Sequence, residues 1–147
     1  MASIDEHLVS ALSSVMRSLE RPLAIHIAAV GLTATQFTVL ERLLHKGPQT
    51  VNDLIRGLLS TGGNMAVVID NLISAGLLLK TPNPADGRSR IINLTEAGRK
   101  KINDYYPAHK SELTRLLGGI PAVEKKQLIK QLATLRRNLE GEANEQL

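Results

Sequence analysis

The sequence predicts a mainly α-helical protein that carries one small β-hairpin near its middle. Apolar residues recur at spacings of three and four along most of the chain, which is the period of helices packed on a core. Between residues 77 and 94, two stretches suited to strands flank a segment rich in proline, asparagine, aspartate and glycine. The 147 residues are 43% hydrophobic but include only two tyrosines and one phenylalanine, so we expect a single domain, 1–147, with an aliphatic core.

A long amphipathic helix is expected at the N-terminal end, over about residues 4–30. Its apolar face is formed by Leu8, Leu12, Val15, Leu19 and Leu23. We expect Pro22 to kink this helix and Gly31 to end it.

The next two helices are short. Thr33 and Gln36 have the spacing of a capping box, which predicts that the second helix begins after Thr33. Its apolar side includes Phe37 and Leu40, and Gly47-Pro48 should end it. A third helix is expected over residues 51–59.

A glycine-containing turn over residues 60–64 leads into a fourth helix, with Thr61 as the expected cap. The predicted inward stripe of this helix consists of Met65, Val68, Ile69, Leu72 and Gly76. The predicted outward side consists of Gly62, Gly63, Asn64, Ala66, Val67, Asp70 and Asn71. Two short helices joined in this way are typical of a helix-turn-helix, whose second helix lies in the DNA major groove.

The hairpin follows at once. Gly76 should end the fourth helix, and residues 77–81 suit a strand. Residues 82–87 should form a turn that continues neither strand, and a second strand should then reach Leu94. Arg88 and Arg90 lie in this hairpin, within reach of phosphates or of the minor groove. A hairpin directly after a helix-turn-helix is a wing, so the fold class is a winged helix-turn-helix.

Two further helices complete the expected fold. Thr95 should cap the fifth, whose apolar pattern is interrupted at Pro107 and stops at Gly118-Gly119. The sixth has Pro121 in its first turn and a narrow leucine seam.

These elements suggest a winged-helix DNA-binding lobe over about residues 33–98, with dimerisation helices over about 4–30 and 99–142. The terminal helices have more apolar surface than a compact lobe needs, which predicts a homodimer. The alternative is that they pack within one subunit as a monomeric bundle.

Charge is concentrated around the hairpin. Residues 80–101 hold six basic residues against two acidic ones, while the whole chain has a net charge of +4. A local basic cluster favours a polyanion such as double-stranded DNA, although a solvated surface would look similar.

The composition argues against catalysis and against metal or cofactor binding. The chain has no cysteine, its four histidines lack metal-ligand spacing, and no glycine-rich segment is followed by the lysine of a phosphate-binding loop. We therefore expect no enzyme, no metal and no cofactor. With no signal-like start and no apolar run long enough for a membrane span, we expect a cytoplasmic protein without a membrane partner.

The chain resembles the MarR-type (multiple antibiotic resistance regulator) family of bacterial transcription factors over nearly its whole length. The motifs behind this are Leu32-Thr33 with Gln36-Phe37, Val51 with Asp53-Leu54, Ile69-Asp70-Asn71-Leu72 with Gly76-Leu77, and Asp86-Gly87-Arg88 with Leu94-Thr95 and Gly98. The resemblance implies a dimeric repressor that releases a palindromic operator when a small ligand, often phenolic or another aromatic anion, binds. It also implies that Asp86 orients the wing arginines and that Arg88 enters the minor groove.

The fourth helix is unusual because no basic residue lies between Arg56 and Lys80. Direct readout would then depend on Asn64, on contacts of Ala66 and Val67 with thymine methyl groups, and on close backbone approach at Gly62 and Gly63. We expect an AT-rich site. The alternative function is a protein-interaction module that keeps the winged fold but has weak or lost operator binding.

An effector site is expected where the terminal helices meet the lobe. Its candidate residues are His26, Phe37, Tyr105, Tyr106 and His109. Each has another interpretation: Phe37 as plain core, the tyrosines at the dimer seam, and the histidines in solvent. Binding to DNA without any effector is a further alternative.

Overall fold

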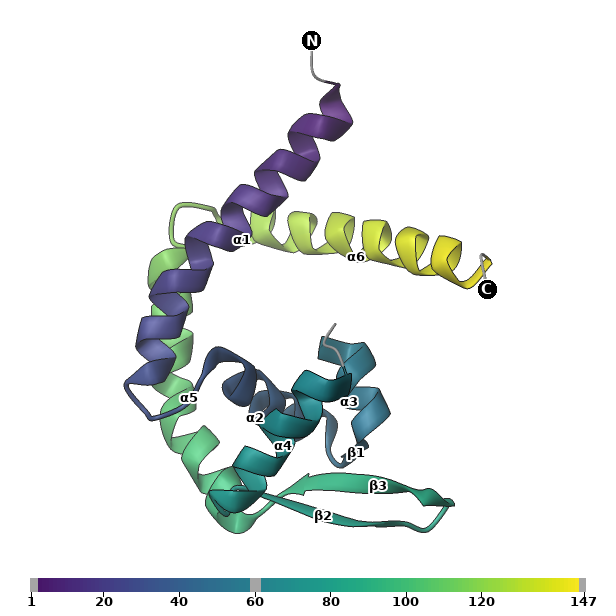
Figure 1. Ribbon diagram of the computed structural model, residues 1–147. Helices are drawn as coiled ribbons and strands as arrows, with labels where there is room; N and C mark the ends of the chain where they lie inside the picture. The colour runs from purple at the N-terminus through teal and green to yellow at the C-terminus, as the bar shows by residue number, and fades with distance from the viewer. Residues whose placement is uncertain (1–2, 59–61, 146–147) are drawn as a thin grey trace. The chain divides into compact units, whose positions relative to one another are not determined.

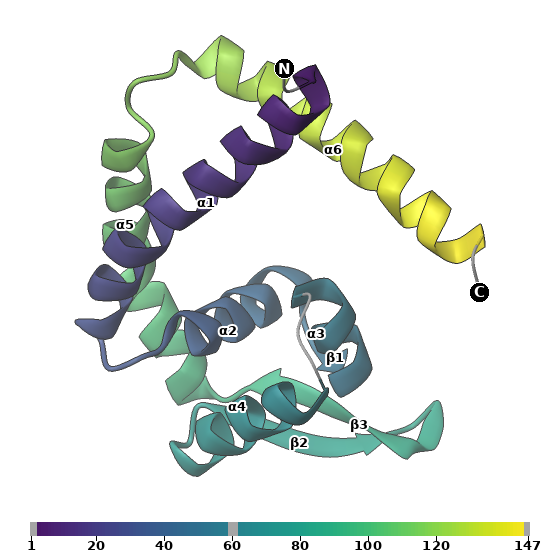
Figure 2. The same cartoon turned by 45° about the horizontal axis from the view of Figure 1, so that its top comes forward.

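The computed structural model describes residues 3–58 and 62–145 (Figures 1 and 2). The elements are α1 (Ile4–Ala28), α2 (Ala34–Lys46), β1 (Gln49–Thr50), α3 (Val51–Leu58), α4 (Gly62–Ser74), β2 (Leu78–Asn83), β3 (Asp86–Leu94), α5 (Glu96–Leu116) and α6 (Ala122–Glu145). They form two compact units, residues 1–112 and 113–147. The predicted fold class, mainly helical with a winged helix-turn-helix, is confirmed.

Side-chain caps begin α2 and α5 at Thr33 and Thr95, as the sequence predicts, and a further cap that was not predicted begins α1. The Thr33 hydroxyl accepts a hydrogen bond from the Gln36 amide at 3.2 Å, and the Gln36 side chain accepts one from the Thr33 amide at 2.9 Å. Ser3 and Glu6 form a similar capping box at the start of α1. Each reciprocal pair satisfies backbone donors that a helix start would otherwise leave open.

The core of the first unit is aliphatic, as expected, and it is formed mainly by α2, α3, α4, α5 and the sheet. Its fully buried members include Val39, Leu40, Leu54, Met65, Ile92 and Ile102. The inward stripe of α4 is confirmed for Met65, Val68, Ile69 and Leu72. Gly76 does not belong to it, because α4 ends at Ser74 and Gly76 is an exposed residue with a φ of 73°.

The wing is part of a three-stranded antiparallel sheet with the order β1-β3-β2. The sequence did not predict β1, since two residues are too few to show a period. The predicted turn over 82–87 is too long: β2 continues to Asn83 and β3 begins at Asp86. Pro82 is compatible with β2 because β2 is an edge strand, where one side of the backbone needs no donor.

The predicted interruption at Pro107 is also wrong, because α5 is continuous through it. The exposed proline removes one backbone donor, while Tyr105 and His109 on either side are buried and hold the helix against the rest of the first unit. Pro22 likewise lies inside α1.

In the second unit, α6 exposes most of its apolar side chains. Val123 is 73% exposed, Ile129 65% and Leu139 58%. Over the residues that the structure describes, no helix is both long enough and apolar enough to cross a membrane.

Candidate nucleic-acid interface and aromatic cluster

The outward face of α4 is exposed, as the sequence predicts for a recognition helix. The exposed residues are Gly63, Asn64, Ala66, Val67, Asp70 and Asn71. Gly62 is the first residue of α4, and Thr61, the predicted cap and contact residue, lies outside the described residues. Val67 is 58% exposed, which leaves a branched apolar side chain on the surface. Such a side chain is suited to contact with thymine methyl groups.

Asp70 is the only charged residue in the sequence of α4. Its carboxylate lies 3.5 Å from Nζ of Lys80 on β2, and both side chains are solvent-accessible. An exposed pair of this kind contributes at most about 1 kcal/mol to stability. The pair places a cation beside the acidic side chain of α4.

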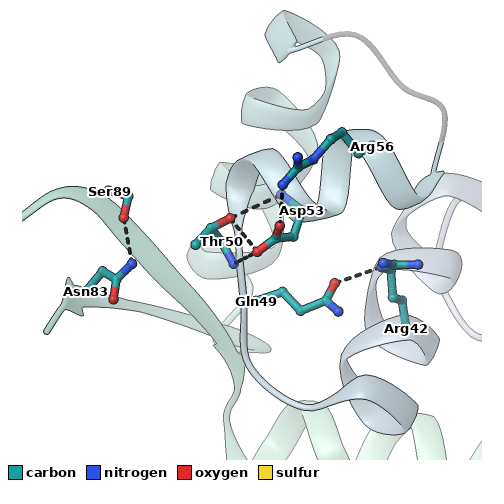
Figure 3. A network of polar contacts seen from close by, with 7 residues as sticks. All are labelled: Arg42, Gln49, Thr50, Asp53, Arg56, Asn83 and Ser89. Carbon is teal, nitrogen blue, oxygen red and sulfur yellow. Dashed lines mark hydrogen bonds and ion pairs between the residues drawn. The ribbon is translucent and has the colours of Figure 1, made fainter. Parts of the chain in front are cut away.

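Hydrogen bonds within the wing fix the backbone around its arginines. Oδ1 of Asp86 accepts a hydrogen bond from the amide of Arg88 at 3.0 Å. The Ser89 hydroxyl donates to the Asp86 carbonyl at 3.2 Å and accepts from Nδ2 of Asn83 at 2.8 Å (Figure 3). Asp86 thus contacts the backbone of Arg88, and this contact shapes the strand that bears Arg88 and Arg90, both exposed.

The start of α3 has a network that the sequence analysis missed (Figure 3). The Thr50 hydroxyl donates to Oδ2 of Asp53 at 2.7 Å and accepts from the Asp53 amide at 3.1 Å, while Arg56 donates to Oδ1 of Asp53 at 2.8 Å. The hydrogen bond from Thr50, followed by that from Arg56, lowers the pKa of Asp53. The signal was available, because threonine followed by an acid three residues later is typical of a helix start.

Arg42 joins α2 to this region. Its Nε donates to Oε1 of Gln49 at 2.7 Å (Figure 3). The guanidinium fills the space beside Gly57 on α3, where an added Cβ would lie 2.0 Å from Cζ of Arg42. Only glycine leaves room for this contact, so Arg42 positions both β1 and α3.

Four of the five candidate effector residues come together from α1, α2 and α5. The ring centroids of Phe37 and His109 are 4.5 Å apart, and the Tyr105 ring lies 5.2 Å from His26 and 5.4 Å from Phe37. Phe37, Tyr105 and His109 are buried, and His26 is half-buried. Phe37 is core, as the alternative interpretation holds, and it also touches the two polar aromatic residues.

Among the described residues, three buried polar atoms of this cluster have no hydrogen-bond partner: Nε2 of His26, the hydroxyl of Tyr105 and Nδ1 of His109. Leaving such atoms unpaired is costly, and native proteins rarely do so. Burial raises the pKa of Tyr105, with a smaller contribution from Glu112. Burial also lowers the pKa of His109, with a smaller contribution from His26, while Glu41 acts in the opposite direction. Burial therefore favours the neutral forms of Tyr105 and His109.

Tyr106 behaves differently from its neighbour. Its hydroxyl lies 3.0 Å from Nε2 of His45 on α2, and its ring is 6.2 Å from that of His109. The structure therefore separates the two tyrosines: Tyr105 points an unpaired hydroxyl into the cluster, and Tyr106 ties α5 to α2.

Comparison with known proteins agrees with this geometry. The sequence profile of the MarR family matches residues 30–89. The HTH-type transcriptional regulator MhqR of Bacillus subtilis is 31% identical over 127 residues, which cover 86% of this chain and 88% of that protein. A mutant of MarR from E. coli complexed with operator DNA has a similar fold, with a TM-score of 0.78 and 22% identity over 91% of this chain and 99% of that one. BpsR of Bordetella bronchiseptica, whose DNA binding is regulated by 6-hydroxynicotinic acid, has a TM-score of 0.80 and 23% identity over 92% of this chain and 97% of that one.

Proposed function

The chain belongs to the MarR family of transcription regulators, and from this premise we propose that it represses transcription as a homodimer bound to a palindromic operator. The observation that supports this most directly is the exposed, nearly neutral face of α4 together with a wing whose outer half bears Arg88 and Arg90. A helix face and a basic hairpin of this kind provide base contacts and phosphate contacts respectively.

In this proposal α4 lies in the major groove and the wing reaches the flanking minor groove. Asn64 and Asn71 supply hydrogen-bonding side chains, Ala66 and Val67 contact thymine methyl groups, and the backbone of Gly62 and Gly63 approaches the duplex closely. Thr61 is a further expected contact residue. Asp86 holds the strand that presents Arg88 and Arg90 to the minor groove and phosphates. Because an AT-rich minor groove is narrow and attracts arginine, we expect an AT-rich site.

The dimer would form through the terminal segments, about residues 4–30 and 99–142, outside the lobe of about 33–98. Each terminal segment supplies exposed apolar surface of its own. On α1 the exposed apolar residues are Ile4, Leu8, Val9, Val15, Met16 and Ile25, and on α6 they are Val123, Leu128, Ile129, Leu132 and Leu139. Repeated large apolar side chains on a helix surface mark an interaction site rather than a solvent face. A monomeric mass in light scattering at micromolar concentration would exclude this dimer.

The aromatic cluster would bind the effector. A small aromatic molecule with a hydroxyl or carboxyl group could stack on Phe37 and supply partners for His26, Tyr105 and His109, the residues that hold the unpaired atoms. Tyr106 would border this site through its contact with His109. The regulation of BpsR by 6-hydroxynicotinic acid, an aromatic acid with a hydroxyl group, supports this class of ligand.

Selection of bound duplexes from a random DNA pool tests the proposed function. We expect enrichment of a palindrome whose half-sites lie about one helical turn apart. Arg88→Ala should weaken the enrichment. Arg136→Ala removes the same charge on α6, and it should leave the enrichment unchanged provided that light scattering shows the oligomeric state of the wild type. If the wild-type protein enriches no sequence, the alternative of a protein-interaction module replaces the regulator. Addition of 6-hydroxynicotinic acid and simple phenols to the selected complex then tests for an effector.

A further inference from the structure

A cavity of about 230 Å³ lies between the wing and the start of α3. Its basic wall is formed by Lys80 of β2 and by Arg88 and Arg90 of β3. Its opposite wall is formed by Thr50, Val51 and Asn52, where β1 passes into α3. Three cations therefore face the positive end of a helix across a space large enough for more than one water molecule.

The pattern of the wing explains why its cations gather there. In the antiparallel register Lys80 is opposite Ile92 and Pro82 is opposite Arg90, so Lys80, Arg90 and Ile92 share one face of the hairpin. Ile92 is fully buried in the core. The same face of the wing is therefore aliphatic near the core and basic beyond it, and the basic part lines the cavity.

The two arginines of this cavity have no acidic partner among the described residues. Among the described residues, neither Arg88 nor Arg90 takes part in an ion pair, and the only carboxylate near Lys80 is Asp70, at 3.5 Å in an exposed pair. Asp53, the nearest acid on α3, is bound by Thr50 and Arg56 and does not line the cavity. At the start of a helix the first amides have no partner within the helix, which adds donors from Val51 and Asn52 to the same site.

We propose that this cavity seats one phosphate of the DNA backbone, with Lys80, Arg88 and Arg90 on one side and the first turn of α3 on the other. The inference rests on the proposed function, which places α4 in a major groove and the wing in the neighbouring minor groove. A phosphate backbone separates those two grooves, and the cavity lies between the start of α3 and the wing. Tetrahedral oxyanions are bound by arginine side chains and by helix starts in this way. Asn52 thereby becomes a DNA-contacting residue that the sequence did not indicate, and Lys80, known from the sequence only as one member of the basic cluster, gains a specific contact. Thr50 lines the cavity, but its hydroxyl and its amide both donate to Asp53.

Asn52→Asp is the most specific test, because aspartate has the same size and is favourable in the first turn of a helix. The free energy of unfolding, measured with urea, should stay unchanged or rise slightly, whereas the new carboxylate should repel a phosphate. We expect about a tenfold loss of affinity for the selected duplex, the factor typical of one charge-assisted hydrogen bond. Asn103→Asp on the exposed surface of α5 makes the same charge change away from the cavity. It is the matched control, and light scattering must show that it keeps the oligomeric state of the wild type, because residue 103 lies in a proposed dimerisation segment.

A second measurement locates the phosphate. Single phosphates of the duplex are replaced in turn by neutral methylphosphonates, and binding is measured with wild-type protein and with Lys80→Met. At one position in each half-site, the methylphosphonate should strongly weaken DNA binding by the wild type and only slightly weaken DNA binding by Lys80→Met. The variant should also reduce the slope of log affinity against log salt by about 0.9 per site.

The outcomes separate this inference from the proposed function. If Arg88→Ala weakens binding but Asn52→Asp behaves like Asn103→Asp, the phosphate seat is wrong and the regulator remains. If no duplex is bound, the proposed function fails as well. The amide resonances of Val51 and Asn52 are then followed during titration with inorganic phosphate against chloride at equal ionic strength. Saturable shifts with phosphate and none with any duplex would assign the cavity to a free phosphorylated ligand and overturn the DNA assignment.

Discussion

The hydroxyl of Thr95 donates a hydrogen bond to the carbonyl oxygen of Gly76 at 2.6 Å and accepts one from the amide of Gly98 at 3.0 Å. The Thr95 amide also donates to the carbonyl of Leu77 at 3.1 Å. One residue thus caps α5 and binds the backbone that follows α4. The two helices are joined at the base of the wing, and their separation there depends on how closely α5 can approach.

Gly98→Ala should disrupt this joint. An added Cβ would lie 2.0 Å from the carbonyl oxygen of Leu77, a backbone atom that cannot move aside alone. We expect a loss of about 2 to 3 kcal/mol in the free energy of unfolding, since overpacking exceeds the helix-forming advantage of alanine. Urea denaturation measures this loss. Gly119→Ala, which has open space around its Cβ, is the control, and equal stabilities of the two variants would contradict the prediction.

The two adjacent tyrosines should respond oppositely to the loss of their hydroxyls. Tyr105→Phe removes a buried hydroxyl that has no partner and should raise the free energy of unfolding by about 1 kcal/mol. Tyr106→Phe removes a hydroxyl that is bonded to His45 and should lower the free energy of unfolding by about 0.5 to 1 kcal/mol. Urea denaturation of both variants measures the sign of each change in the free energy of unfolding. A loss of stability in Tyr105→Phe would show that the Tyr105 hydroxyl of the wild type is hydrogen-bonded.

Stability should fall as the pH is lowered through the range in which His109 titrates. In the unfolded chain this histidine titrates near its ordinary value of 6.5, whereas burial lowers its pKa in the folded chain. Between the two values the unfolded state binds more protons, so the free energy of unfolding decreases as the pH falls from about 7 to 5. His109→Gln removes this contribution and should flatten the pH dependence. The same slope in both proteins, measured by urea denaturation at several pH values, would exclude His109 as its source.

The helical part of this fold could be predicted because its signals are local and repeated. The capping box at Thr33 and the stripe of Met65, Val68, Ile69 and Leu72 depend on spacing alone, and the structure confirms both. The strand β1 could not be predicted, since its two residues gain their structure only from pairing with Ile91 and Ile92. The predicted interruption at Pro107 does not occur, because the tertiary packing of the residues on both sides of Pro107 outweighs the loss of one backbone hydrogen bond.

The candidate site, like the fold, could be predicted only in part. Spacing alone placed the outward residues of α4, and the structure exposes those that it describes. The sequence did not reveal Asn52, and it placed Lys80 only within a basic cluster, because the cavity that unites the two residues exists only when α3 and the wing fold against each other. The different surroundings of Tyr105 and Tyr106 likewise depend on α2, which supplies His45 as the hydrogen-bond partner of Tyr106.

Contacts of α4 with thymine methyl groups can be tested without a structure of the complex. Replacing thymine by uracil at successive positions of the selected site removes one methyl group at a time. Where Val67 is in contact, the wild type should lose about fourfold in affinity, the value of one buried methyl group. Val67→Ala should bind both duplexes almost equally at that position. If uracil has the same effect on both proteins at every position, Val67 does not read thymine.

The pairing of β1 with β3 has a consequence for how an operator is chosen. Gln49 and Thr50 are continuous with α3 and are hydrogen-bonded to the strand that bears Arg88 and Arg90. The wing therefore cannot swing away from the helix-turn-helix unless this part of the sheet breaks. In the proposed complex with DNA, the distance between the major-groove and minor-groove contacts would then be set inside one subunit. Regulation would act on the spacing between two half-sites, while the sequence preferred within each half-site would stay constant.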